Sequence, residues 1–203
     1  AAYLLRRART QASAERAQET LDLFAALRDH GPTGTPHWSI INGALDAPCA
    51  HAGGKVTATQ TTSSWVADLR GPAPLHWATG TAAPCTSLFK PIRVDDPCPQ
   101  PGDDRASDLA DPATGWWRHE DLHRLVLRDH AASVARFRPE RDRIESVWVA
   151  DPPSTTDAVI EAEAAEARWL ADLVAADLPE RRPRWLRSLW SGWDQGAGRG
   201  ATT

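Results

Sequence analysis

Residues 61–79 read TTSSWVADLRGPAPLHWAT, and this stretch decides the fold class. Its first half has a two-residue period, which is the period of a strand with one face on a core. The residues predicted to face that core are Trp65, Ala67 and Leu69. The letters GPAP that follow are typical of a turn, and a return strand after them would bring Leu75 and Trp77 to the same core. The stretch therefore predicts an antiparallel hairpin.

Helical periods on both sides of the hairpin place the strands in the middle of the chain. A further strand is predicted over 87–94 and a short one over 38–41. The complete division is helical residues 1–30, antiparallel strands within 49–94, a surface loop over 97–115, helical residues 116–190 and a flexible tail over 194–203. The order α, β, α within one unit predicts an α+β fold.

Three helices are predicted in the second helical region. The first covers 117–137 and the second covers 140–149. The third begins at Ser154, whose spacing to Asp157 resembles a capping box, and continues to Leu178. Beyond it, a short amphipathic turn would dock three apolar side chains on the core, namely Trp185, Leu186 and Trp190.

Composition excludes two classes of protein. The 203 residues carry a net charge of −4, without the basic surplus of a protein that binds nucleic acid by neutralising phosphates. Apolar runs are too short to cross a bilayer, so no membrane span is expected. The three cysteines, Cys49, Cys85 and Cys98, cannot all pair within the chain, which favours a reducing compartment. With no visible signal peptide, we expect a cytoplasmic location.

Residues 119–123 read HEDLH and match the zinc-helix pattern H-E-x-x-H. Histidines four residues apart lie about 6 Å apart along one face of a helix. His119 and His123 are therefore candidate zinc ligands, with Glu120 as the general base of a zinc hydrolase. This zinc hydrolase is one alternative for the function.

The neighbours of the motif argue against a metal at this position. Asp121 and Arg124 bring charges to positions that are uncharged in most helices of this kind. A third ligand is needed, and His130 lies about 10 Å farther along the axis, so Glu140 or Glu145 would have to supply it from the next helix. We therefore expect no metal and no cofactor, with the motif histidines and His130 lining a partly buried polar seam.

Residues 48–54, PCAHAGG, hold a cysteine and a histidine two positions apart. In a strand both side chains project from one face, so the imidazole of His51 could lower the pKa of the Cys49 thiol and make it a nucleophile. The sequence names no third residue to orient the imidazole. Cys49 and His51 are the candidate catalytic residues. The alternative is that Cys49 is a small buried residue without a catalytic role, and the same two interpretations apply to Cys85.

Four blocks of the sequence resemble the C-terminal half of the secernin family, which is related to bacterial cysteine-type dipeptidases. The blocks are CAHAGG (49–54), QTTSSWVADL (60–69), HWATGTAAPCTSLFKP (76–91) and WWRHEDLHR (116–124). Their order and approximate spacing are similar over about 17–145, and the third block is long enough to be specific. The resemblance makes the pair His119 and Glu120 a family feature without zinc.

The resemblance implies an N-terminal-nucleophile hydrolase fold, an αββα sandwich of two antiparallel sheets between helical layers. The nucleophile of this family branch is a cysteine at the first position of the mature chain, with its own α-amino group as general base. Here position 1 is Ala1, no cysteine precedes Cys49, and the chain has no methionine, so we expect a truncated or processed chain. No catalytic residue is therefore carried over from the family.

The resemblance thus implies that 1–203 is the C-terminal portion of one secernin-like dipeptidase or amide hydrolase, inactive alone. The complete protein would act on a dipeptide or a similar small amide, and the family would allow a homo-oligomer. A non-catalytic interaction module is the remaining alternative, because some secernins are associated with secretion-related roles.

Overall fold

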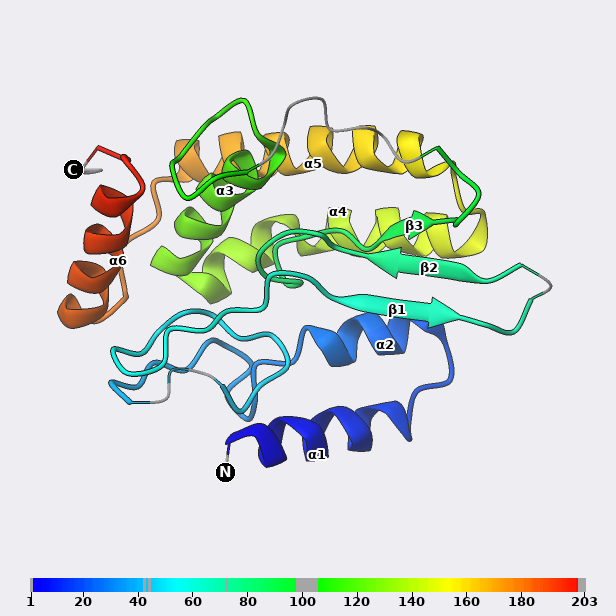
Figure 1. The fold of residues 1–203 in the computed structure, drawn as a ribbon, viewed down its shortest axis with the longest axis horizontal. Helices are drawn as coiled ribbons and strands as arrows, with labels where there is room; N and C mark the ends of the chain where they lie inside the picture. Colours follow the sequence, from blue (N-terminus) through cyan, green and yellow to red (C-terminus); the bar gives the residue numbers. More distant parts are fainter. Residues whose placement is uncertain (1, 42, 44, 72, 98–105, 201–203) are drawn as a thin grey trace.

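The chain forms an α+β fold, described for residues 2–41, 43, 45–71, 73–97 and 106–200 of a computed structural model. Its elements are α1 (Ala2–Ala14), α2 (Thr20–Leu27), β1 (Trp65–Asp68), β2 (Leu75–Ala78), β3 (Lys90–Ile92), α3 (Gly115–Arg128), α4 (His130–Ala150), α5 (Thr155–Ala176) and α6 (Arg184–Gly196). The strands pair antiparallel in the order β1-β2-β3. In Figure 1, α2 lies along β1, and α5 lies on the side of β3. The predicted α+β class with antiparallel strands is confirmed.

The inner face of β1 is the opposite of the predicted one. Val66 pairs with Trp77 across the strands, and both side chains are buried. Trp65 and Leu69 are 62% and 68% exposed, so the prediction that Trp65, Ala67 and Leu69 face the core is wrong. Successive side chains of a strand point to opposite faces, so the pairing of Val66 with Trp77 turns its neighbours outward.

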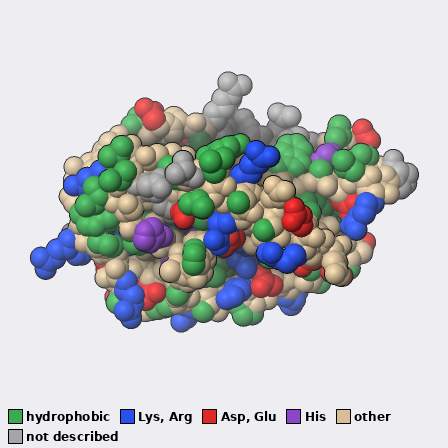
Figure 2. All heavy atoms as spheres, turned by 90° about the horizontal axis from the view of Figure 1, so that it is seen from below, with side chains coloured by type: hydrophobic (Ala, Val, Ile, Leu, Met, Phe, Trp, Pro, Cys, Tyr) green, Lys and Arg blue, Asp and Glu red, His purple; other side chains and the backbone are tan. Residues whose placement is uncertain are grey.

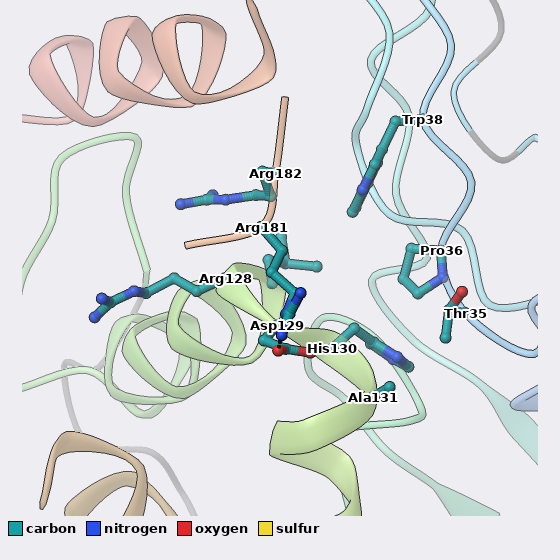
Figure 3. Close-up of a pocket in the computed structure, with 10 residues that line it drawn as sticks. Thr35, Pro36, Trp38, Arg128, Asp129, His130, Ala131, Arg181 and Arg182 are labelled. Atoms are coloured by element: carbon teal, nitrogen blue, oxygen red, sulfur yellow. Dashed lines mark hydrogen bonds and ion pairs between the residues drawn. The ribbon is translucent and has the colours of Figure 1, made fainter. Parts of the chain in front are cut away.

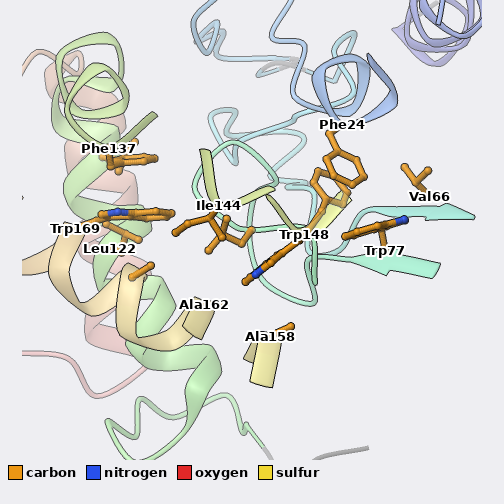
Figure 4. Close-up of a cluster of buried hydrophobic side chains, with 14 of the residues drawn as sticks. Phe24, Val66, Trp77, Leu122, Phe137, Ile144, Trp148, Ala158, Ala162 and Trp169 are labelled. Carbon is orange, nitrogen blue, oxygen red and sulfur yellow. The ribbon is translucent and has the colours of Figure 1, made fainter. Parts of the chain in front are cut away.

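The main core lies between the sheet and the long helices (Figure 4). Trp77 is 1% exposed, as predicted, and Leu75 is half-buried against the same core. The ring of Phe24 on α2 stacks on Phe89 with centroids 4.2 Å apart and meets Trp77 edge-on at 5.5 Å. The helices contribute Leu122, Phe137, Ile144, Trp148, Ala158, Ala162 and Trp169. Burial of this apolar surface is the main source of stability.

Asp129 divides the predicted first helix of the second helical region. Its φ of −144° and ψ of 85° end α3, and its carboxylate accepts a hydrogen bond from the backbone nitrogen of Ala132 at 3.3 Å, which caps α4. The predicted helix 117–137 is therefore parts of two helices, and the predicted helix 140–149 is the second half of α4. Since α4 continues through Pro139, the capping aspartate and not the proline sets the boundary.

Two predictions for the C-terminal helices are confirmed. Ser154 caps α5, because its Oγ accepts a hydrogen bond from the backbone nitrogen of Asp157 at 3.1 Å. Leu186 and Trp190 of α6 are buried, and Nε1 of Trp190 donates to the carbonyl oxygen of Ala52 at 3.0 Å. Helix α6 thereby covers part of the irregular segment between α2 and β1.

Two predicted segments differ from the structure. Residues 38–41 are irregular and end in a turn, so the short strand predicted there is wrong. Helix α6 continues to Gly196, so the tail predicted over 194–203 begins inside a helix. Residues 201–203, and residues 98–105 of the predicted loop with Cys98, lie outside the described residues.

A buried ion pair joins α2, α4 and the segment before β3. The guanidinium of Arg28 makes two bonds to the carboxylate of Glu145, at 2.7 and 2.6 Å, and the side chains are 10% and 1% exposed. Arg28 also donates to the carbonyl oxygens of Pro84 and Ser87, both at 2.8 Å. The backbone nitrogen of Phe89 donates to the same carboxylate at 2.8 Å. Glu145, considered above as a zinc ligand, is therefore committed to this pair.

Replacing Glu145 with Gln is expected to lower the free energy of unfolding by about 3–5 kcal/mol, because Arg28 would remain buried without a counter-charge. The matched control is Asp172→Asn, which removes the partner of Arg136 in a half-exposed pair and should cost less than about 1 kcal/mol. Urea unfolding of both variants measures the difference. Equal losses in the two variants would contradict the prediction.

Candidate metal centre

Four buried side chains from three separate segments converge at one point. They are His30, which follows α2, Cys49 and His51 between α2 and β1, and Cys85 between β2 and β3. One nitrogen or sulfur atom of each lies within 4.8 Å of the corresponding atoms of all the others. The exposed fraction is 8% for His30, 2% for Cys85 and 0% for the other two. We call these four residues the His/Cys centre.

Hydrogen bonds to the backbone hold each segment of the His/Cys centre in place. The nitrogen of Cys49 donates to the carbonyl oxygen of Asp29 at 3.1 Å, which ties the second segment to the end of α2. Thr61 anchors the backbone immediately before Cys49, because its Oγ1 donates to the carbonyl oxygen of Pro48 at 2.7 Å. The carbonyl oxygen of Cys85 accepts from Nη1 of the buried Arg141 at 2.7 Å. The four side chains are thus presented by anchored backbone.

Three separations from Nε2 of His51 lie close to the edges of a zinc tetrahedron. Zn–N bonds of about 2.0–2.1 Å and Zn–S bonds of about 2.3 Å give edges of about 3.3–3.4 Å between nitrogens and about 3.5–3.6 Å between nitrogen and sulfur. From Nε2 of His51 the distances are 3.1 Å to Nε2 of His30, 3.6 Å to Sγ of Cys49 and 3.5 Å to Sγ of Cys85. Nε2 of His51 can share one proton with only one of these neighbours, whereas one cation would bind all four.

Burial and mutual charge set the protonation of the His/Cys centre. Burial lowers the pKa of His51 to about 3, so its imidazole is neutral, which is the form that binds a metal. Burial acts to raise the pKa of Cys85, but the hydrogen bond from Cys49 and the interactions with His51, His130 and His30 outweigh it, and the pKa falls. Burial, together with that neighbouring thiolate, raises the pKa of Cys49. A cation bound at the centre would favour the thiolate form of both cysteines.

The structure separates the two histidines of the H-E-x-x-H motif. Nε2 of His119 lies 2.6 Å from the carbonyl oxygen of Ala82, and Nδ1 lies 2.8 Å from Oε2 of Glu166. Burial acts to lower the pKa of His119, but the charge and hydrogen bond of Glu166 outweigh it and raise the pKa. Both ring nitrogens of His119 therefore face acceptor oxygens, an arrangement that favours the charged imidazolium. His123 instead places Nε2 2.9 Å from Nδ1 of His51, behind the His/Cys centre.

His130 lies beside the His/Cys centre, away from the motif histidines. Its ring meets the rings of His30 and His51 edge-on, with centroids 4.5 and 5.6 Å apart. Within the described part of the chain its ring nitrogens make no hydrogen bond of normal geometry, and the ring lies close enough to Cys85 to help lower the pKa of that thiol. Glu140, the other acid considered as a ligand, binds Arg168 at 2.7 Å and the indole of Trp169 at 2.8 Å.

Figure 3 shows the residues that line a cavity of about 230 Å³, which lies one layer of side chains away from the His/Cys centre. Trp38 and His130 form the part of its wall that contacts the ring of His51. Three arginines also line it, and each has an acidic partner: Arg128 with Asp177, Arg181 with Asp129, and Arg182 with Glu180. The charges around the cavity are therefore balanced.

Sequence reasoning found two members of the centre and missed two. Sγ of Cys49 and Nε2 of His51 lie 3.6 Å apart, within reach as predicted, but their segment is irregular backbone and not the predicted strand. Cys85 was noted only as a small cysteine, although it lies in the longest block of the secernin resemblance. His30 carries no local signal beyond its place before Gly31, whose φ of +93° lies in the turn that follows α2.

The salt bridge of His119 and Glu166 predicts a pH-dependent stability. The pKa of His119 is raised in the folded state. Its contribution to stability is therefore complete below the pKa of about 6.5 in the unfolded chain, and it is lost as pH rises through the pKa of the folded state. The pKa of Glu166 is lowered by His119 despite burial, so its contribution is present above about pH 4.5 and is lost as pH falls further.

Glu166→Gln is therefore expected to lower the free energy of unfolding by about 3 kcal/mol near pH 5.5 and by less above pH 8. Urea unfolding across this pH range measures the loss. Glu163→Gln on the same helix, which breaks the exposed pair with Arg118, is the control and should show a small and nearly constant loss. A loss for Glu166→Gln that does not change between about pH 5 and pH 9 would contradict the assignment of an imidazolium.

Comparison with known proteins leaves the function to be argued from the site itself. Basic and acidic side chains are interspersed on the face that Figure 2 shows, in keeping with the net charge of −4. Among the described helices, none combines the length and the apolar character that a membrane span requires. No protein-family model, no curated protein and no solved structure matches this chain.

Proposed function

We propose that this chain is a zinc-binding domain in which His30, Cys49, His51 and Cys85 hold one Zn²⁺. The observation that carries the proposal is the convergence of four buried nitrogen and sulfur atoms within 4.8 Å of one another, with three of them 3.1–3.6 Å from Nε2 of His51. A ligand set of thiolates and imidazoles selects zinc over magnesium or calcium, which prefer oxygen ligands. Four protein ligands fill the coordination of the ion, as in zinc sites that stabilise a fold.

The zinc would join three segments that lie far apart in the chain. It would link the end of α2, the irregular segment before β1 and the turn before β3. Ligands that bind only the folded state add to its stability, by about 4 kcal/mol when free zinc exceeds the dissociation constant by about 1,000-fold. The domain would therefore be most stable in its metal-bound form.

Burial favours a metal over a nucleophilic thiol at this site. Cys49 is 0% exposed and Cys85 is 2% exposed, so a peptide bond has no path to either sulfur without opening of the fold. Reactive cysteines are partly exposed, because substrate must reach them. The candidate dyad of Cys49 and His51 is accordingly assigned to metal binding.

The secernin resemblance supports a second, compatible proposal for the whole protein. Three of the four resembling blocks supply residues of the centre or its neighbour: 49–54 holds Cys49 and His51, 76–91 holds Cys85, and 116–124 holds His123. On this proposal the chain is the C-terminal portion of a secernin-like dipeptidase or amide hydrolase with an N-terminal-nucleophile fold, and the zinc stabilises that portion. This proposal includes a dipeptide substrate, a homo-oligomer and a cytoplasmic location, all of which stay predictions. The non-catalytic interaction module stays the alternative to it.

We expect the purified chain to contain one zinc ion per molecule by elemental analysis, and the variants Cys85→Ser and His30→Gln to lose it. The control is His37→Gln, which replaces an exposed histidine and should keep the zinc. His119→Gln should also keep it, because that imidazole is bound by Glu166 and not by the centre.

A second measurement does not depend on the folding of variants. A strong chelator should lower the melting temperature of the unmodified chain, and added zinc should restore it. The proposal is wrong if the chain carries no metal and melts identically with chelator and with zinc. Loss of zinc in His119→Gln, with retention in Cys85→Ser, would support the zinc hydrolase of the H-E-x-x-H motif instead.

A further inference from the structure

A line of three buried side chains leads away from the His/Cys centre into α3. Nδ1 of His51 lies 2.9 Å from Nε2 of His123, and Nδ1 of His123 lies 3.6 Å from Oε1 of Glu120. The exposed fractions of His51, His123 and Glu120 are 0%, 0% and 3%. The rings of the two histidines lie nearly parallel, with an interplanar angle of 18°. These contacts occur on the side of His51 that faces away from the other three members of the centre.

The proton positions along this line follow from a single condition. If Nε2 of His51 binds zinc, the one proton of its neutral ring is on Nδ1, which then donates to Nε2 of His123. His123 must accept at Nε2, so its own proton is on Nδ1, which faces the carboxylate of Glu120. In the described part of the chain Nδ1 of His123 has no hydrogen bond within normal distance, so this carboxylate is its charged neighbour.

Glu120 is fixed as a carboxylate at the end of the line. Arg124 binds its Oε2, and Nε2 of Gln60 donates to its Oε1 at 3.3 Å. Arg124 is itself held by Asp194 at 2.6 Å. Burial acts to raise the pKa of Glu120, but His123 and Arg124 outweigh it and lower the pKa to about 2. A negative charge therefore stands at the far end of the line at all ordinary pH values.

We propose that His123 and Glu120 are positioning residues that hold His51 in its zinc-binding tautomer and ring orientation. The proposal rests on the zinc site proposed above. Histidine ligands commonly donate their free N–H to a carboxylate or another acceptor, and removal of that acceptor weakens metal affinity by about 10- to 100-fold. Two residues of the H-E-x-x-H motif would thus serve zinc without binding it, one layer behind a ligand from another segment.

The test compares two replacements of His123 that differ in one property. In His123→Gln the side-chain carbonyl oxygen can still accept a hydrogen bond from Nδ1 of His51, whereas in His123→Leu nothing can. Both variants remove the histidine beside Glu120, so any loss of stability from that cause is common to the two. The difference between their zinc affinities isolates the acceptor.

We expect zinc competition against a chromophoric chelator to show affinity about 10- to 100-fold lower for His123→Leu than for the unmodified chain, with most of it restored in His123→Gln. The thiolate-to-cobalt absorption of the Co²⁺-loaded chain should shift in His123→Leu and be retained in His123→Gln. Equal zinc affinities for His123→Leu and the unmodified chain would overturn the inference while leaving the zinc site intact. If the unmodified chain itself binds no zinc, the proposed function fails, and this inference fails with it.

A measurement on the unmodified zinc-bound chain covers the case in which the variants do not fold. Long-range proton–nitrogen NMR correlations report which imidazole nitrogen carries the proton. We expect protonated Nδ1 in both His51 and His123. A proton on Nε2 of His123 would overturn the inference.

Discussion

The bidentate ion pair between Arg28 and Glu145 is the interaction on which the His/Cys centre depends. Arg28 lies two residues before His30, and its guanidinium also binds the carbonyl oxygen of Pro84, immediately before Cys85. One buried cation thus sets the positions of two candidate ligands that are far apart in the chain. Because neither member of the pair can leave without stranding the charge of the other, both segments are held tightly.

Local patterns predicted the features that depend on neighbours along the chain. The cap at Ser154 follows from its spacing to Asp157, and the inward side chain of Trp77 follows from the alternation of faces along a strand. The face of β1 could not be found in this way, because Trp65 is as apolar as Val66 and only the register with β2 decides between them. His30 was missed for the same reason, since its role comes from partners on other segments.

The H-E-x-x-H motif shows how one spacing can yield two different kinds of histidine. His119 and His123 have the spacing that a zinc helix requires, yet their nitrogens face unlike groups. His119 lies between a carbonyl oxygen and the carboxylate of Glu166, which together favour the charged ring. His123 faces the neutral ring of His51. Residue spacing places the two imidazoles on one face, but the partners supplied by other segments decide their chemistry.

The separation of the ligands along the chain has a kinetic consequence. Residues 30, 49–51 and 85 must meet, and closing the chain between them costs entropy before any bond to an ion is formed. An ion bound here would gain all four ligands only once α2 and the segments around the hairpin have come together. By the same reasoning a bound ion leaves only when those segments part, so its rate of exchange would report how often the native structure opens.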